Sequence, residues 1–210
     1  MFVRDFMTSH PITITQDTPI FQALEIIKKH KVRHLPVLKD GRIVGLVTER
    51  GLLTVSPSPA TTLSVYELNY VLAKVTVREA MVKNPVTVAP DCPIEEAGQL
   101  MWEKRIGSLL VTDGERLVGI LTQTDMIEAV VRLLGLRKPG ARLVIETHDR
   151  IGVLAELTQI FRDNNINIRS VATIEIEPGK YQLLFRLNVP DVGPVAGEIE
   201  RRGFQIISIS

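Results

Sequence analysis

Cysteine is almost absent from this sequence of 210 residues, in which Cys92 is the only one. A single cysteine excludes an internal disulfide and any zinc site built from cysteine pairs, so we expect a reducing, cytoplasmic location. Long apolar runs are missing too. Stretches such as Leu109-Leu110-Val111 are far shorter than the roughly 20 residues that a membrane helix needs, so no membrane association is expected.

An excess of one charge is also missing. Twenty-five Lys and Arg residues face 24 Asp and Glu residues, which leaves a net charge of +1. No block of basic residues stands out, so nothing indicates a nucleic acid or a membrane surface as the partner.

Signatures of catalysis are missing as well. The histidines are scattered, and the sequence contains no HExxH, Gly-x-Ser-x-Gly or P-loop pattern. We therefore predict no catalytic residues and no metal site, and a small stand-alone enzyme remains only a remote alternative.

An internal repeat is the strongest feature that is present. When the chain is shifted by 74 residues, fifteen of the fifty positions 3–52 find an identical partner without any gap. The matched pairs include Val3/Val77, Met7/Met81, Gly45/Gly119 and Thr48/Thr122. Unrelated segments of ordinary composition match at about one position in sixteen, so the sequence contains a duplication.

Both copies predict the same order of elements. A short strand leads to Asp-x-Pro, which is typical of a helix start, and the helix in 20–27 has apolar residues at i, i+3, i+4 and i+7. Two apolar strands follow, joined by Asp40-Gly41 or Asp113-Gly114, and a second helix starts near Thr48 or Thr122. Each copy is therefore β-α-β-β-α, and the two copies are expected to pack as one pseudo-symmetric domain.

The remaining residues predict a different domain. Pro139-Gly140 marks a linker, and the pattern from Ala141 onward is βαββαβ, a ferredoxin-like order, with one helix burying Val153, Leu154, Leu157, Ile160 and Phe161. The expected fold is α+β. Its expected segments are repeat 1 (1–55), a connector helix (56–74), repeat 2 (75–133), a linker (134–140) and the C-terminal domain (141–210).

A motif at the last strand–helix junction of the second repeat has two interpretations. It reads Gly-Ile-Leu-Thr-Gln-Thr-Asp over 119–125, with Thr122 at the helix start and Asp125 three residues later. Such a pair can simply cap the helix. It can also bind a ligand, because the free amides attract a phosphate and the carboxylate can accept hydrogen bonds from a ribose diol.

Residues 1 to about 133 resemble a tandem pair of CBS domains, a Bateman module, because both copies open with Val-Arg-(Asp/Glu)-x-Met and combine this with the repeated topology. The resemblance implies that an adenosine nucleotide (AMP, ADP or ATP) binds between the repeats as a regulatory ligand, with no other cofactor. It places Thr122 on phosphate and Asp125 on ribose, with the base held near Val86, Thr87, Ile106, Gly107 and Ser108.

The first copy departs from this pattern because Gly51 stands where the ribose-binding acid is expected. We expect a weaker or differently selective site there, built from Thr13, Ile14, Arg33, His34, Thr48 and Arg50. Arg4 and Arg78 enter the two repeats at matching positions. They are either phosphate contacts or solvated surface charges.

Residues 141–210 resemble an ACT domain through Asp149-Arg150-Ile151-Gly152-Val153-Leu154-Ala155-Glu156 and Ile166-Asn167-Ile168, although Ile151 replaces the usual proline. The resemblance implies dimerisation and an amino acid or similar effector held by Thr147, Asp149, Gly152 and Asn167. Asp149 and Gly152 can equally serve only to cap and pack the helix.

The whole chain resembles AcuB-type acetoin-utilisation proteins. We predict a homodimeric, non-catalytic ligand sensor that controls an unidentified partner protein. The alternative is a ligand-free assembly scaffold.

Overall fold

The computed structural model describes residues 1–55 and 75–210, and the predicted connector helix lies outside these residues. The chain forms two compact units, Met1–Ile127 and Glu128–Ser210.

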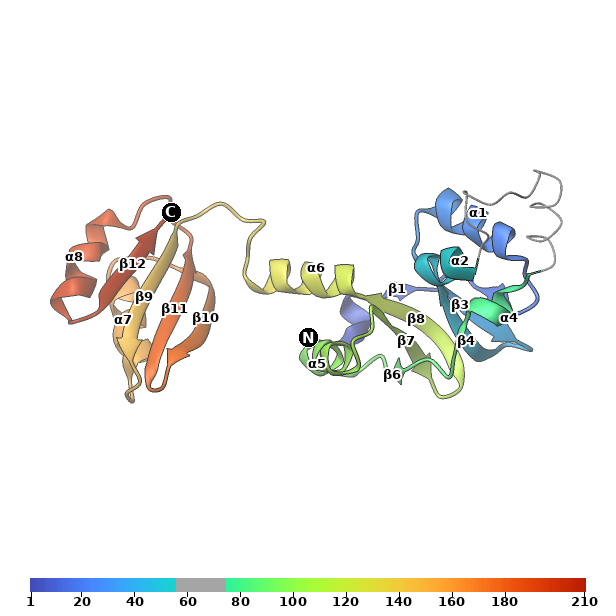
Figure 1. The fold of residues 1–210 in the computed structure, drawn as a ribbon. Helices are drawn as coiled ribbons and strands as arrows, with labels where there is room; N and C mark the ends of the chain where they lie inside the picture. Colours follow the sequence, from blue (N-terminus) through green and yellow to red (C-terminus); the bar gives the residue numbers. More distant parts are fainter. Residues whose placement is uncertain (56–74) are drawn as a thin grey trace. The chain divides into compact units, whose positions relative to one another are not determined.

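The two repeats have the predicted β-α-β-β-α order (Figure 1). The first contains β2 (Ile14–Thr15), α1 (Ile20–His30), β3 (His34–Lys39), β4 (Arg42–Thr48) and α2 (Glu49–Val55). The second contains β6 (Thr87–Val88), α5 (Ile94–Lys104), β7 (Ser108–Asp113), β8 (Arg116–Thr122) and α6 (Gln123–Leu133). Helices α1 and α5 bury Ile20, Ala23 and Ile27 and their counterparts Ile94, Ala97 and Met101, as the apolar spacing predicts.

The entry segments of the two repeats are exchanged. The 3-10 helix η1 (Val3–Asp5) leads to β1 (Thr8–Ser9), which pairs with β8 of the second repeat. Helix α4 (Val77–Ala80) leads to β5 (Val82–Lys83), which pairs with β4 of the first repeat. The sheets therefore have the orders β2-β3-β4-β5 and β1-β8-β7-β6, and each is completed by a strand from the other copy.

Close contacts accompany this exchange. A Cβ atom added at Gly119 would meet Sδ of Met7 at 2.4 Å, and one added at Gly45 would meet Sδ of Met81 at 2.6 Å. The repeated glycines thus leave room for the repeated methionines, each contributed by the other copy. The pair of repeats is one folding unit, because neither sheet is complete within its own copy.

Apolar side chains join the two sheets. Leu46, Leu110 and Ile120 form a buried cluster against which Ile43 and Leu117 pack. At the rim, Arg42 lies 3.4 Å from Glu115, an exposed pair that contributes little to stability. The predicted packing of one repeat's sheet on the other's is therefore confirmed.

The second unit is a four-stranded antiparallel sheet with two helices. It contains β9 (Arg142–His148), α7 (Val153–Asp163), β10 (Ile168–Glu177), β11 (Lys180–Leu187), α8 (Gly193–Arg201) and β12 (Gln205–Ile209), in the sheet order β10-β11-β9-β12. This is the predicted βαββαβ topology. Its core includes an edge-to-face contact between Phe161 and Phe185, with ring centroids 5.1 Å apart.

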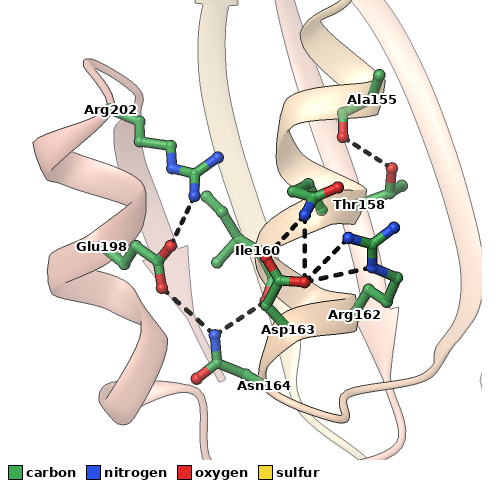
Figure 2. A network of polar contacts seen from close by, with 9 residues as sticks. Ala155, Thr158, Ile160, Arg162, Asp163, Asn164, Glu198 and Arg202 are labelled. Atoms are coloured by element: carbon green, nitrogen blue, oxygen red, sulfur yellow. Dashed lines mark hydrogen bonds and ion pairs between the residues drawn. The ribbon is translucent and has the colours of Figure 1, made fainter.

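Helices α7 and α8 lie side by side and share polar contacts at their ends (Figure 2). The Asn164 side-chain amide donates to the Ile160 carbonyl at 2.9 Å and to the Glu198 carboxylate at 3.3 Å, while Arg202 donates to the same carboxylate. The predicted buried face of α7 is right except at Leu154, which is 43% exposed.

Candidate functional site

The junction between β8 and α6 carries a tight polar contact. The backbone N–H and the hydroxyl of Thr122 both donate to Oδ2 of Asp125, each at 2.7 Å. This is the cap that the spacing predicts. Both bonds end on Oδ2, so Oδ1 takes part in neither of them. Capping and ligand binding are therefore compatible at this residue.

A cavity of about 360 Å³ opens at this junction, and we call it the Asp125 cavity. Its second-repeat lining comes from Ile120, Thr122, Thr124 and Asp125. Its first-repeat lining comes from Thr8, His10, Pro11, Ile12, Lys31, Val32, Arg33 and His34. The volume lies in the usual range for small-molecule sites, and the lining combines apolar side chains with a few polar ones.

Arg33 connects the two sides of this cavity. One guanidinium nitrogen, Nη2, donates to the Thr124 hydroxyl at 3.0 Å, across the boundary between the repeats. Burial of the ring and the neighbouring Arg33 charge hold the pKa of His34 below its ordinary value, so the imidazole is neutral at neutral pH. The cavity therefore offers a fixed positive charge beside a neutral ring.

None of the predicted second-repeat base residues lines the Asp125 cavity, although Ser108 lies opposite Thr122 in the pairing of β7 with β8. Val86, Thr87, Ile106, Gly107 and Ser108 occupy the repeat positions of Ile12, Thr13, Val32, Arg33 and His34. The first-repeat members of these pairs, apart from Thr13, line the Asp125 cavity. Ser108 is buried and 4% exposed. The base of a ligand at Asp125 would thus lie against the first repeat, because each helix start faces the opposite copy.

The first-repeat junction is built differently. The backbone N–H of Gly51 donates to the Thr48 hydroxyl oxygen at 3.0 Å, so this threonine accepts where Thr122 donates. A Cβ at position 51 would lie 3.2 Å from that hydroxyl and 3.4 Å from the Ala80 carbonyl. Of the other predicted residues here, Thr13 is exposed and Ile14 packs in the first repeat's core.

Arg4 and Arg78 lie in contacts outside the cavities that we describe. The Arg4 guanidinium stacks over the Phe2 ring at 4.6 Å. Arg78 forms an ion pair with Asp17 at 2.7 Å. These contacts favour the interpretation of both arginines as surface charges, and their role as phosphate contacts stays a prediction.

A second cavity, of about 620 Å³, adjoins the same helix start, and we call it the arginine cavity. It is lined by Arg33, His34, Thr48, Glu49, Arg50, Arg105, Gly107, Thr122 and Gln123. Arg33, His34 and Thr122 belong to both cavities. Predicted residues of both repeats thus meet here, including Thr48, Arg50 and Gly107.

The second unit has a cavity of about 340 Å³ at the start of α7, which we call the Asp149 cavity. Thr147, Asp149 and Gly152 line it, as predicted, together with Thr173 and Tyr181. Gly152 stands at the helix start with φ +93°, a left-handed conformation that favours glycine. It has no side chain to accept from the first-turn amides, of which the Val153 N–H donates to the Arg150 carbonyl at 3.5 Å, and an anionic group could accept from the others.

The fourth predicted effector residue, Asn167, lies elsewhere in this unit. Strand pairing places His148 opposite Lys180 and Ile168 opposite Leu187, at the two ends of β11. Eight residues of antiparallel strand span about 24 Å. Asp149 and Asn167 of one chain therefore lie at opposite ends of the sheet, too far apart to hold one small effector together.

Two carboxylates, those of Glu175 and Asp149, act on Tyr181 of the Asp149 cavity. The Glu175 carboxylate, burial and Asp149 raise the pKa of the Tyr181 phenol, so its hydroxyl stays protonated over the physiological range. The Tyr181 hydroxyl already hydrogen-bonds with Glu175, so the carboxylates here suit a ligand that carries an ammonium group.

Sequence reasoning missed most of the lining of the Asp125 cavity, namely Thr8, His10, Pro11, Ile12, Lys31, Val32, Ile120 and Thr124. A signal for Lys31 existed, because its repeat partner Arg105 is also basic. Lys31 and Arg105 each stand at the C-terminal end of a helix in the left-handed conformation, with φ of 54°. Within the described ranges, no group of three His, Cys, Asp or Glu side chains could hold a metal ion, and no helix could cross a membrane.

Comparisons with known proteins agree with this organisation. The CBS-domain family model matches residues 3–58 and 77–132, and the ACT-domain family model matches residues 141–208. The uncharacterized protein MJ1426 of Methanocaldococcus jannaschii is 30% identical over 155 residues, which cover 62% of this chain and 92% of that protein. The predicted order of two CBS domains and one ACT domain is confirmed.

Solved structures are similar over the repeat pair. A protein of Vibrio cholerae described as an acetoin utilization protein (AcuB) aligns with 65% of this chain over 95% of its own length, at 27% identity and a TM-score of 0.53. CBSX2 in complex with AMP aligns with 62% of this chain and 96% of its own, at 29% identity and a TM-score of 0.51. The CBS domain pair of MJ0100, in complex with 5-methylthioadenosine and S-adenosyl-L-methionine, aligns with 62% of this chain and 99% of its own length. Its identity is 26% and its TM-score is 0.51.

Proposed function

Because this chain belongs to the CBS-domain family and ends in an ACT domain, we propose that it is a regulatory ligand sensor whose repeat pair binds an adenosine nucleotide. The observation that carries this proposal is the Asp125 cavity, where a capped helix start in one repeat faces Ile12, Val32 and Arg33 of the other. In this assignment Oδ1 of Asp125 accepts from the ribose diol, and the base packs against Ile12 and Val32.

The phosphate side of the ligand has partners in the same cavity. Thr122, Thr124 and Arg33 line it. The Thr124 hydroxyl and the Arg33 guanidinium can donate to a phosphate, whereas the Thr122 hydroxyl already donates to Asp125. The solved complexes of CBSX2 with AMP and of MJ0100 with adenosine derivatives support an adenosine ligand for this kind of repeat pair. A bound ligand would contact both repeats and thereby favour one arrangement of the pair, which is how a sensor transmits its state.

Replacing Asp125 with alanine is expected to weaken AMP and ATP binding at least tenfold. Charge-assisted hydrogen bonds of the kind that Asp125 would form with a ribose contribute about 1.5–3 kcal/mol each, and about 1.4 kcal/mol is a factor of ten. Isothermal titration calorimetry of the full chain measures the loss. It also counts the sites, and we expect one strong site per chain because Gly51 offers no carboxylate.

A matched control comes from another capped helix start. Glu79 accepts from the Thr76 N–H at 3.3 Å and lines neither the Asp125 cavity nor the arginine cavity. Glu79→Ala removes a comparable cap, so it is expected to leave nucleotide affinity unchanged. Unaltered affinity in Asp125→Ala would contradict the ribose contact. If the parent chain binds no adenosine compound, the ligand-free scaffold is the correct interpretation.

For the C-terminal unit, we propose an amino acid or similar effector held between two copies of the chain. The Asp149 cavity supports this, because it combines a carboxylate for an ammonium group with a start of α7 that has no side-chain cap and can receive a carboxylate. Asn167 can contribute only from a second copy, since it lies at the other end of its own sheet. The effector site therefore requires a homodimer, which in turn would act on a regulated protein.

A screen of the common amino acids by thermal shift is expected to find one or a few that stabilise the chain. Asp149→Ala and Asn167→Ala are each expected to abolish that shift, while light scattering still shows a dimer. An effector effect that survives Asn167→Ala would place the whole site within one chain. If no amino acid stabilises the protein, the unit is a dimerisation domain only.

A further inference from the structure

We infer that the repeat pair selects nucleoside polyphosphates over monophosphates, with the phosphate chain extending from the Asp125 cavity into the arginine cavity. This inference rests on the proposed nucleotide site and names its ligand more narrowly. The juxtaposition that carries it is the arginine cluster of Arg33, Arg50 and Arg105 beside the helix start that would hold the first phosphate.

The two cavities are continuous at the point where a phosphate would leave the ribose. Arg33, His34 and Thr122 line both of them. Asp125, the expected ribose contact, lines only the first, whereas Arg50 and Arg105 line only the second. A ligand anchored by its ribose at Asp125 and passing Thr122 would therefore direct its next groups toward the two further arginines.

The charge of the arginine cavity is largely uncompensated. Its lining contains three arginines and a single carboxylate, that of Glu49. Among residues 1–55 and 75–210, none of the three guanidinium groups forms an ion pair with a carboxylate. Arginine presents several donors in a planar fork and suits phosphate oxygens, so a phosphate chain would supply the missing negative charge.

The duplication shows that the fold does not need two of these arginines. Position 33 corresponds to Gly107 and position 50 to Thr124, and the second repeat forms the same strands and helices with these small residues. The strands and helices of a repeat therefore do not require these basic side chains, although Arg33 also donates to Thr124 across the repeats. A monophosphate at Thr122 would be within reach of Arg33, which leaves Arg50 and Arg105 for further phosphates.

Arg105 also occupies a strained backbone position. It ends α5 with φ of 54°, in the left-handed region where a side chain other than glycine or asparagine costs about 1–2 kcal/mol. A positive charge near the C-terminus of a helix is favourable, but the charged residue need not be the one with the left-handed backbone. A contact with a phosphate chain would account for an arginine at this position.

Titration of the full chain with AMP, ADP and ATP at one ionic strength tests the inference. We expect affinity to rise with each added phosphate, so that ATP binds at least tenfold more tightly than AMP. Two variants test whether the phosphate chain of the ligand enters the arginine cavity. Arg50→Thr installs the residue of the other repeat, and Arg105→Gly removes the charge while relieving the backbone.

Each variant is expected to lower ATP affinity about fivefold and to change AMP affinity by less than twofold. Arg105→Gly should also leave the melting temperature unchanged or raised, which a structural role for this arginine would not allow. Arg116→Thr is the control, because Arg116 is exposed in the hairpin of the second repeat and lines neither cavity. It should alter no affinity.

The outcomes separate this inference from the proposed function. If AMP binds as tightly as ATP, the polyphosphate preference is wrong while the nucleotide site stands. If ATP binds more tightly but both variants bind it like the parent, the phosphate chain does not enter the arginine cavity. If neither nucleotide binds the parent, the proposed function itself fails.

Discussion

Replacing Gly140 with alanine is expected to unfold the C-terminal unit and to leave the repeat pair folded. A Cβ at this position would lie 2.0 Å from the Leu187 carbonyl oxygen, and the backbone has φ of +151°. The carbonyl cannot move away, because the adjacent Leu187 N–H donates to the Ala141 carbonyl at 3.0 Å. Steric overlap and backbone strain together should cost about 3 kcal/mol or more.

Hydrogen exchange read strand by strand measures this effect. Amides of β9 and β11 should lose protection in Gly140→Ala, while those of β3 and β7 keep theirs. Gly179→Ala is the matched control, since Gly179 also has a positive φ, of +74°, but a Cβ there meets nothing within 4 Å. It should cost only about 1 kcal/mol. Equal losses in the two variants would show that backbone strain, not the carbonyl contact, dominates at Gly140.

Much of this architecture was predictable because local patterns determine it. The period of the apolar residues in 20–27 and the Asp40-Gly41 turn identify a helix and a hairpin without knowledge of the rest of the chain. Duplication then predicts the same elements 74 residues later. Leu154 shows the limit of periodicity, because it stands in the first turn of α7, where the helix faces the Asp149 cavity rather than the core.

The grouping of the site residues could not be predicted in the same way. Sequence spacing relates residues within one repeat, so it assigned Arg33 and His34 to the Thr48 junction and Val86 to Asp125. In the structure Arg33 and His34 line the arginine cavity with Thr48, and they also line the Asp125 cavity, where Arg33 donates to Thr124 of the opposite repeat. Contacts between copies depend on how the two sheets pack, and that packing leaves no periodic trace in the sequence.

The exchanged entry strands are another such contact. The identity of Gly45 with Gly119 and of Met7 with Met81 showed only that the copies are alike. It did not show that each glycine accommodates the methionine of the other copy. A sequence of two equal units is compatible with both the closed and the exchanged arrangement, since the same contacts form in each.

Because the entry segments are exchanged, the entry residues of each repeat stabilise the other repeat. Val77 belongs to the second repeat by alignment, yet its side chain is fully buried in the core of the first, with Ile14 and Leu35. Its N–H donates to the Thr18 carbonyl at 2.9 Å. The corresponding N–H of Val3 donates to the Cys92 carbonyl of the second repeat, also at 2.9 Å.

Val77→Ala is therefore expected to loosen the first repeat, and Val3→Ala the second. Each variant removes two buried methyl groups and leaves a cavity, which should cost about 2 kcal/mol in the free energy of unfolding. Hydrogen exchange distinguishes the sites: amides of β3 should lose protection first in Val77→Ala, and those of β7 first in Val3→Ala. The paired variants control for each other because the substitution and the burial are the same. Loss of protection in β7 before β3 in Val77→Ala would mean that each repeat keeps its own entry strand in solution.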